Sequence, residues 1–301
     1  MVLGGNVFGW TADKQTSFAI LDRFADAGLE AVDTADVYSS WAPGNSGGES
    51  ESIIGEWMAS RRRREKTVVI TKVGSEMGPG SKGLSAAYIP RAIDASLRRL
   101  RSDYVDIYLS HWPDPSVPYE ETLGAFQTLK DAGKVREIGA SNLDAAQLQA
   151  ALDVAREKGL PRYAILQPEY NLYDRERFEG ALRDVTVGEG IDVITYFSLA
   201  KGFLAGKYRS EADLGKSPRG GSVKGYLNER GRRILEALDA VAAAHRAQPG
   251  EVALAWLIAQ PGVTAPIASA TSVQQVESLI RSASLQLTQG ELAELDRASA
   301  I

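Results

Sequence analysis

Four side chains in this sequence could together carry out acid–base chemistry: the carboxylate of Asp33, the phenol of Tyr38, the ammonium of Lys72 and the imidazole of His111. Asp33, Lys72 and His111 follow one another in equal steps of 39 residues. The equal steps predict equivalent heights on consecutive strands. A phenol, with a pKa near ~10, is a weak acid–base catalyst at neutral pH. A neighbouring ammonium would favour its phenolate form, and a carboxylate would keep that ammonium charged and in place.

Each side chain also has a purely structural interpretation. Asp33 and Lys72 could form an ion pair that only stabilises the fold, and Tyr38 could be an aromatic loop residue. His111 is one of only two histidines, and with no cysteine in the chain the composition predicts no transition-metal site. Their convergence on one cleft is what favours a shared chemical role.

Short apolar runs alternate with amphipathic stretches along nearly the whole chain. The runs are rich in β-branched or aromatic residues and most are apolar at successive positions, which is typical of strands covered on both faces. The predicted strands are Val2–Phe8, Ala31–Thr34, Thr67–Val73, Tyr104–Ser110, Glu137–Ser141, Ala164–Gln167, Asp192–Phe197 and Thr264–Ala268. This pattern predicts an α/β fold, a single (β/α)₈ TIM barrel over residues 1–301, with a doubly wound sheet as the alternative. In a barrel, the residues just past the C-terminal strand ends face the active site.

Two segments depart from a regular strand–helix repeat. Lys201–Gly231 is polar, rich in glycine and longer than loops that only connect a strand to a helix. We expect residues 200–231 to form a loop that covers a cofactor, with a disordered loop as the alternative. Near the end of the chain, Thr288 and Glu291 form a capping-box pattern, which predicts a terminal helix over residues 288–299.

Composition excludes several classes of protein. The net charge of −5 does not favour binding to nucleic acid or to an anionic membrane. The absence of cysteine excludes disulfides and fits the cytoplasm. The longest apolar run, Val252–Ala259, is far too short to span a bilayer, and the N-terminus lacks the features of a signal peptide. We therefore expect a cytoplasmic protein with neither nucleic acid nor membrane as a partner.

Three segments around these side chains resemble one known family. They are Asp-Thr-Ala-Asp-Val-Tyr at 33–38, Thr-Lys-Val at 71–73, and Tyr-Val-Asp-Ile-Tyr-Leu-Ser-His-Trp-Pro-Asp at 104–114. These resemble the signature segments of the aldo-keto reductases, and the likeness extends over nearly the whole chain. The resemblance implies an NAD(P)H-dependent oxidoreductase that interconverts small carbonyl compounds and alcohols. It assigns Tyr38 as general acid, tuned by Lys72 and Asp33, and gives His111 the role of orienting the carbonyl oxygen.

The same resemblance implies a set of cofactor residues. Ser141, Asn142 and Gln167 would hold the nicotinamide carboxamide, Tyr196 would stack on its ring, and the segment from Gly202 to Lys207 would wrap the pyrophosphate. The full set is Gly5, Asn6, Asp33, Ser141, Asn142, Gln167, Tyr196, Phe197, Ser198, Leu199, Gly202, Lys207, Arg219, Ser269, Thr271 and Gln275.

The implied cofactor is NADPH, with NADH as the second candidate. A 2′-phosphate calls for cationic or hydroxyl donors near the adenosine ribose. Ser269, Thr271 and Gln275 are neutral, so the positive charge would come from Lys207 and Arg219 in the loop. Many family members have Lys or Arg in this segment and a Glu-Asn pair after it, where this chain has Ser-Leu at 278–279.

The substrate site is predicted to be apolar and open. Trp10, Trp41 and Trp112 would line it together with Tyr38 and His111, and Asn6 and the loop at 39–48 would complete its walls. Some family members narrow this site with a long C-terminal extension, whereas here the predicted last helix nearly ends the chain. We therefore expect broad activity on small aromatic and aliphatic aldehydes.

A second class of function stays open. Some aldo-keto reductase relatives are regulatory subunits that bind cofactor without necessarily turning over substrate, so this fold alone does not establish catalysis. The presence of all four catalytic residue types favours an enzyme. One further motif, Gly78-Pro79-Gly80-Ser81-Lys82-Gly83, matches a dinucleotide-binding pattern, but it neither directly follows a strand nor directly precedes a helix, which favours a plain loop.

Overall fold

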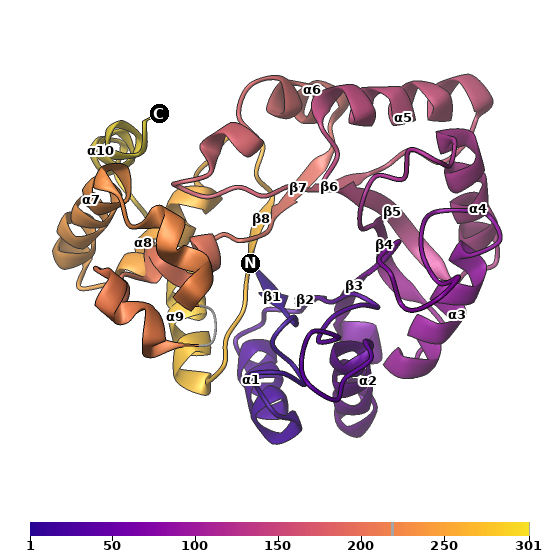
Figure 1. Cartoon of the computed structure of the whole chain (residues 1–301), viewed down its shortest axis with the longest axis horizontal. Coiled ribbons are helices and arrows are strands. Elements are labelled where there is room, and N and C mark those ends of the chain that lie inside the picture. Colours follow the sequence, from indigo (N-terminus) through magenta and orange to yellow (C-terminus); the bar gives the residue numbers. More distant parts are fainter. Residues whose placement is uncertain (218–219, 301) are drawn as a thin grey trace.

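The computed structural model describes residues 1–217 and 220–300. Eight parallel strands close into a barrel in which each strand pairs with its sequence neighbour and β8 pairs with β1 (Figure 1). The strands are β1 (Val2–Gly4), β2 (Ala31–Asp33), β3 (Val68–Val73), β4 (Val105–Ser110), β5 (Val135–Ser141), β6 (Ile165–Gln167), β7 (Asp192–Thr195) and β8 (Ala265–Ala268). The closed ring confirms the predicted single-domain TIM barrel, because a doubly wound sheet would leave two open edges.

Helices surround the strands in Figure 1, and α10 lies beside α7. They are α1 (Lys14–Asp26), α2 (Glu49–Arg61), α3 (Ile89–Leu100), α4 (Tyr119–Asp131), α5 (Ala145–Lys158), α6 (Ala181–Glu189), α7 (Glu229–His245), α8 (Pro249–Ile258), α9 (Val273–Ser284) and α10 (Gln289–Ser299). The capping box predicted at Thr288 and Glu291 is present at the start of α10. Within residues 1–217 and 220–300, no helix is long and apolar enough to cross a membrane.

Two strands are shorter than predicted because the backbone turns early. β1 ends at Gly4 rather than Phe8. The Gly5 amide still donates a hydrogen bond to the Asp33 carbonyl at 2.7 Å. Beyond it the chain turns back on itself, and the Ala12 amide donates to the Val7 carbonyl at 3.0 Å. β7 ends at Thr195, and Phe197 takes a positive φ of 51° that no strand residue adopts. β5 begins earlier than predicted, at Val135 rather than Glu137.

The barrel interior is filled by an apolar layer contributed by different strands. It comprises Val2, Ile70, Leu109, Ile165, Ile194 and Ile267. Side chains of a strand alternate between faces, so the residue two positions later points to the same interior. Those positions hold Lys72 on β3, Gln167 on β6 and, just beyond β4, His111. A polar layer therefore lies directly above the apolar one at the C-terminal end of the barrel.

The strand register explains the equal spacing of Asp33, Lys72 and His111 along the chain. Asp33 pairs with Ile70, and Lys72 pairs with Leu109. Lys72 therefore lies two positions beyond the residue that pairs with Asp33, and His111 lies two positions beyond the residue that pairs with Lys72. The equal steps of 39 residues reflect this constant stagger between tilted strands, which closure of the barrel requires.

The glycine-rich segment after β7 is more ordered than an unstructured loop. Its described residues, 201–217 and 220–231, include the short 3₁₀ helices η3 (Ala200–Ala205), η4 (Glu211–Lys216) and η5 (Gly220–Tyr226), and α7 begins at Glu229, inside the predicted loop. Phe203 stacks on Tyr226 with ring centroids 5.3 Å apart, which joins η3 to η5. Two other short 3₁₀ helices, η1 (Arg64–Lys66) and η2 (Arg175–Arg177), lie in other loops.

Candidate active site

The ammonium of Lys72 is the centre of a compact polar cluster. Its side chain is fully buried, and its Nζ lies 2.7 Å from Oδ1 of Asp33, 2.7 Å from the carbonyl of Thr34 and 2.8 Å from the hydroxyl of Tyr38. Burial lowers the pKa of Lys72, while the charge of Asp33 acts in the opposite direction. A buried ammonium is tolerated here because every direction it donates in meets an oxygen.

Tyr38 reaches this cluster from the loop after β2. The next residue, Ser39, has a positive φ of 71°, and its hydroxyl donates to the Phe8 carbonyl at 2.6 Å, which ties the loop to the turn after β1. The Tyr38 hydroxyl lies 3.2 Å from Oδ2 of Asp33. Burial, followed by the negative charge of Asp33, raises the pKa of Tyr38 well above that of a free phenol. The contact between Lys72 and the Tyr38 hydroxyl that the sequence predicts is present, while desolvation and Asp33 raise the pKa of the phenol.

Asp33, at the end of β2, also receives a hydrogen bond from the opposite side of the barrel. Nε2 of Gln167, on β6, donates to its Oδ1 at 2.8 Å. These two residues are 134 positions apart in the chain. The carboxylate is therefore held by Lys72, Tyr38 and Gln167 together, which fixes its orientation below the mouth of the barrel.

His111 follows β4 and faces Tyr38, with ring centroids 6.1 Å apart. Its amide donates to the Val73 carbonyl at 2.8 Å, and its Nδ1 lies 3.0 Å from the hydroxyl of Ser75. Burial, and then the charge of Lys72, lower the pKa of His111 well below its ordinary value. The imidazole is therefore neutral at physiological pH, and one of its ring nitrogens carries a proton while the other does not.

The predicted substrate-site aromatics form a continuous row of rings. Trp10 meets Trp41 edge to face at 5.8 Å, Trp41 meets Tyr38 at 6.0 Å, and Trp112 stacks on His111 at 5.5 Å. Trp41 is 48% exposed and Trp112 is 49% exposed, so both present open apolar surface beside the polar cluster.

The residues predicted to hold a nicotinamide carboxamide are linked by hydrogen bonds. The Ser141 hydroxyl donates to the Gln167 carbonyl at 2.7 Å, and Nδ2 of Asn142 donates to the His111 carbonyl at 2.8 Å. Tyr196, directly after β7, donates its hydroxyl to Oδ1 of Asn142 at 2.7 Å. The ends of β5, β6 and β7 thus present amides and a hydroxyl at one side of the cluster.

The backbone after β7 is unusual. Phe197, Ala200 and Lys201 have positive φ angles, and Gly202 continues the turn with a φ of 98°. The Ser198 hydroxyl donates back to the Thr195 carbonyl at 3.0 Å. The carbonyl of the half-buried Leu199 accepts a hydrogen bond from the Gly202 amide at 2.8 Å.

Two lysines of this segment lie over aromatic rings. Nζ of Lys201 is 5.2 Å from the centroid of Phe197, and Nζ of Lys207 is 5.0 Å from that of Tyr208. Neither lysine forms an ion pair with any residue in the parts of the chain that the structure describes. Arg219, the other cation predicted for a 2′-phosphate, lies outside the described residues.

The ends of β1 and β8 meet where the barrel closes. The Ser269 hydroxyl donates to Oδ1 of Asn6 at 2.6 Å, and Gly5 is buried next to it. At the start of α9, the Thr271 amide donates to Oε1 of Gln275 at 2.8 Å. The structure thus joins Ser269 to Asn6 across the barrel seam, and Thr271 to Gln275 at the start of α9.

The cations on and beside α9 are already paired with carboxylates. The guanidinium of Arg281 bonds the buried carboxylate of Glu251 with Nε at 3.1 Å, and the Ser278 hydroxyl donates to the same oxygen at 2.7 Å. The guanidinium of Arg23, from α1, bonds Glu277 at 2.9 Å. The adenosine end predicted from the sequence therefore has no uncommitted cation on α9.

Sequence reasoning missed two buried groups beside the cluster. Ser75 bonds His111, and nothing in the local sequence marks it. Asp36 is buried, and neither of its carboxylate oxygens has a well-aligned hydrogen-bond partner among the residues that the structure describes. Burial, and then the charge of Glu51, raise the pKa of Asp36 to about 8, although Arg99 acts in the opposite direction. The charge pattern could not have indicated this, because most aspartates lie at the surface.

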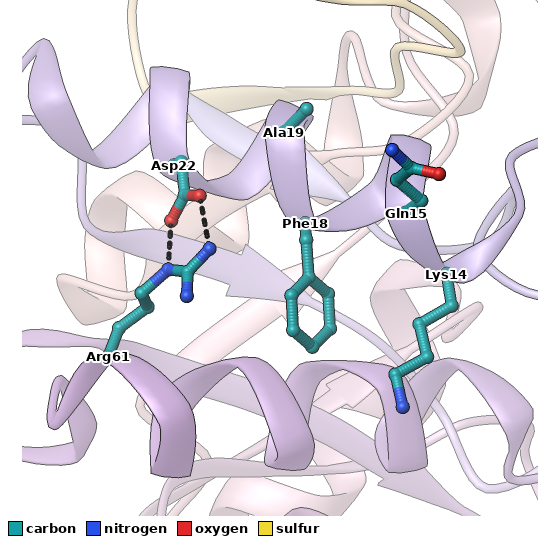
Figure 2. Close-up of a pocket in the computed structure, with 6 residues that line it drawn as sticks. All are labelled: Lys14, Gln15, Phe18, Ala19, Asp22 and Arg61. Atoms are coloured by element: carbon teal, nitrogen blue, oxygen red, sulfur yellow. Dashed lines mark hydrogen bonds and ion pairs between the residues drawn. The ribbon is translucent and has the colours of Figure 1, made fainter.

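A hollow outside the barrel is unrelated to this cluster. It lies between α1 and α2, and Figure 2 shows Phe18 pointing across it towards α2. Asp22 bonds Arg61 there at 2.8 Å, and Lys14 pairs with Glu56. The charges of Arg61 and Lys14 are therefore both paired with carboxylates. The hollow is a feature of the packing between the two outer helices.

His245, the second histidine of the chain, has a role separate from the polar cluster. It ends α7, is partly buried, and its Nε2 lies 2.8 Å from Oε1 of Glu291 on α10. This contact fastens the last helix to the barrel, so His245 has a structural partner far from the polar cluster.

Comparison with known proteins identifies one family for this chain. Residues 1–300 match the model of the Aldo/keto reductase family. The aldo-keto reductase YhdN of Bacillus subtilis is 32% identical, with 92% of this chain and 81% of that protein covered. L-glyceraldehyde 3-phosphate reductase of Escherichia coli is 30% identical (96% and 85% covered), and a probable voltage-gated potassium channel subunit beta of rice, Oryza sativa, is 32% identical (89% and 82% covered).

The family match covers nearly the full length of the chain. It also spans the three segments that supply Asp33, Tyr38, Lys72 and His111. The chain belongs to the aldo/keto reductase family of oxidoreductases.

Proposed function

We propose that the protein is an NADPH-dependent reductase that converts aldehydes and ketones to alcohols, with Tyr38 as the general acid. The observation that carries the proposal is the contact between the fully buried Lys72 ammonium and the Tyr38 hydroxyl, at 2.8 Å, with Asp33 within 3.2 Å of that hydroxyl. A protonated phenol next to a fixed cation can release its proton to an oxygen that gains negative charge.

Each of the four residues has a distinct part in this chemistry. A bound nicotinamide supplies the hydride. Tyr38 donates its proton to the developing alkoxide, and the Lys72 ammonium stabilises the phenolate that remains. Asp33 keeps Lys72 charged and in place. The neutral His111 donates a hydrogen bond to the carbonyl oxygen and orients it towards Tyr38.

The residues at the strand ends fit a nicotinamide cofactor. Ser141, Asn142 and Gln167 supply the hydroxyl and amide groups that a carboxamide requires, and the partly buried ring of Tyr196 lies at the same edge. Lys201 and Lys207 provide positive charge for phosphates in the segment after β7. Phosphate sites in barrels are frequently formed by the loops after strands 7 and 8.

The preference for NADPH over NADH is expected to be moderate. A 2′-phosphate gains most from a charge-assisted hydrogen bond to Arg or Lys. The guanidiniums of Arg281 on α9 and Arg23 on α1 are already bonded to carboxylates, so we expect the contribution to come from Lys207 and Arg219. Lys207→Ala should raise the KM for NADPH more than that for NADH, whereas equal kcat/KM values of the unaltered protein for the two cofactors would overturn the preference.

The activity itself is tested by following the absorbance of NADPH in the presence of a panel of aldehydes. Turnover that depends on both aldehyde and protein supports the proposal. Tight NADPH binding without turnover on any aldehyde favours the second candidate, a cofactor-binding regulatory subunit. The similarity to the rice protein named a probable channel subunit beta is the observation that keeps this candidate.

A further inference from the structure

Ser75 lies two residues beyond the end of β3 and bonds one of the two ring nitrogens of His111. Its Oγ is 3.0 Å from Nδ1. Gly74, with a φ of +118°, turns the chain so that Ser75 points back to the ring, and a side chain at this glycine would crowd Leu84 at 3.1 Å. Ser75 is 9% exposed, so this hydrogen bond is largely shielded from water.

The imidazole of His111 has little freedom to turn away from this bond. Its backbone is fixed on both sides: the amide donates to the Val73 carbonyl, and the carbonyl accepts from Asn142. Trp112 stacks on the ring with an angle of 16° between their planes. With Nδ1 facing Ser75, Nε2 is the nitrogen left to meet a substrate.

The direction of the hydrogen bond between Ser75 and His111 follows from the other acceptors that the Ser75 hydroxyl could reach. If Nδ1–H donated to Ser75, the Ser75 proton would need a second acceptor, and none is within hydrogen-bonding distance among residues 1–217 and 220–300. If the hydroxyl donates to Nδ1, both groups are satisfied. In a neutral imidazole, an unprotonated Nδ1 means that Nε2 carries the proton.

We propose that Ser75 is a positioning residue that donates its hydroxyl proton to Nδ1 of His111 and thereby holds the imidazole in the Nε2–H form. Only that form can donate a hydrogen bond to a carbonyl oxygen, because the other form presents a lone pair to it. The hydrogen-bond direction rests on the geometry alone, and its consequence for catalysis rests on the proposed carbonyl reduction.

The tautomer can be read directly by long-range ¹H–¹⁵N NMR of the protein labelled at histidine. The chain has only two histidines, so His245→Gln leaves the signals of His111 alone. We expect an unprotonated Nδ1 and a protonated Nε2 at neutral pH. A protonated Nδ1 in this spectrum would overturn the proposal, whether or not the protein reduces any aldehyde and whether or not a Ser75 variant folds.

Variants at Ser75 test the consequence for catalysis. Ser75→Ala should shift the tautomer populations and lower kcat about two- to tenfold, the value of one neutral hydrogen bond, with the KM for NADPH unchanged. Ser75→Thr, which keeps the hydroxyl, should restore both. Ser282→Ala is the matched control: it removes a buried hydroxyl from α9, where Ser282 donates to the Leu279 carbonyl at 2.7 Å, and should change neither. An unaltered NMR spectrum in Ser75→Ala would show that Ser75 does not select the tautomer.

Discussion

At the scale of single residues, burial determines which groups carry protons. Tyr38 is both buried and next to Asp33, so the pKa of its phenol rises and the proton stays in place. Lys72 and His111 are shifted in the direction of their neutral forms by the same desolvation. Only Lys72 has a carboxylate in contact to oppose that shift, which is how one cluster holds an ammonium and a neutral imidazole together.

Tyr38→Phe should abolish most carbonyl reduction and spare cofactor binding. The change removes one hydroxyl and leaves the ring, and loss of general acid catalysis costs about 10²–10⁴-fold in rate. The measurements are kcat from NADPH oxidation and the Kd for NADPH from tryptophan fluorescence.

Tyr104→Phe is the matched control for that experiment. Tyr104 directly precedes β4, at the opposite end of the strand from His111, and its ring lies between Arg64 and Arg136. The control should keep full activity. If Tyr38→Phe also does so, Tyr38 is not the general acid.

Asp36→Asn should change how stability depends on pH. The pKa of Asp36 is about 8 in the folded protein and has its ordinary value of 3.8 when unfolded. Between these values the folded state holds a proton that the unfolded state has lost. Stability from this group is therefore complete below pH 4 and falls as pH rises towards 8, by about 1.4 kcal/mol per pH unit.

The uncharged amide removes that dependence while keeping the size of the side chain. Urea unfolding at pH 5 and pH 9 should show that Asp36→Asn gains stability relative to the unaltered protein as the pH rises. Parallel stability curves for the two proteins across this range would contradict a buried, proton-retaining Asp36.

At the scale of elements, the contact between α2 and α3 depends on a glycine. A side chain at Gly55, in α2, would approach the Arg99 carbonyl of α3 to 2.3 Å, closer than any Cβ atom comes to backbone. The two helices support the cluster from outside, because Glu51 of α2 accepts from both Thr71 of β3 and Arg99 of α3, each at 2.6 Å. A change in their spacing would therefore reach the strand that carries Lys72.

Gly55→Ala and Gly124→Ala should have opposite effects on stability. Both glycines lie inside helices, but a Cβ at Gly124, in α4, meets nothing within 4 Å. Gly124→Ala should stabilise the protein by about 0.5–1 kcal/mol, because alanine is the better helix former. Gly55→Ala should destabilise it by about 1–3 kcal/mol through overpacking. Urea denaturation measures both, and a stabilised Gly55→Ala would mean that the helices move apart without cost.

At the scale of the whole molecule, closure of the barrel brings distant segments to one mouth. Asn6 near the start of the chain bonds Ser269 near its end, and the row of rings from Trp10 to Trp112 borders the cluster. The exposed faces of Trp41 and Trp112 offer a substrate apolar surface and few directional contacts.

Such a site should accept many aldehydes. An apolar wall discriminates between homologous substrates by only about 1–3 kcal/mol per methylene, so we expect similar kcat/KM values for small aromatic and aliphatic aldehydes. The measurement is kcat/KM across a panel that includes charged and sugar aldehydes. One substrate preferred over all others by more than about four orders of magnitude would exceed what these walls can provide.

The sequence by itself determined the barrel and the four residues of the cluster. Both depend on local patterns: apolar runs of strand length, and polar residues at or just past the ends of several of these runs. Because side chains alternate along a strand, a residue two positions beyond an inward apolar side chain must also face inward. Asp33, Lys72 and His111 could therefore be recognised without any knowledge of the contacts they make.

Only the tertiary structure decided how these residues are held. Gln167 forms a hydrogen bond with Asp33 across the barrel, and Ser75 forms one with His111 from the end of a neighbouring strand. Glu251 forms an ion pair with Arg281. Each pair joins side chains at least 30 positions apart, and which of many hydroxyls, amides or carboxylates meet is set by strand stagger and helix packing. The same packing buries Asp36, because desolvation depends on what lies around a carboxylate in space and not on its neighbours in sequence.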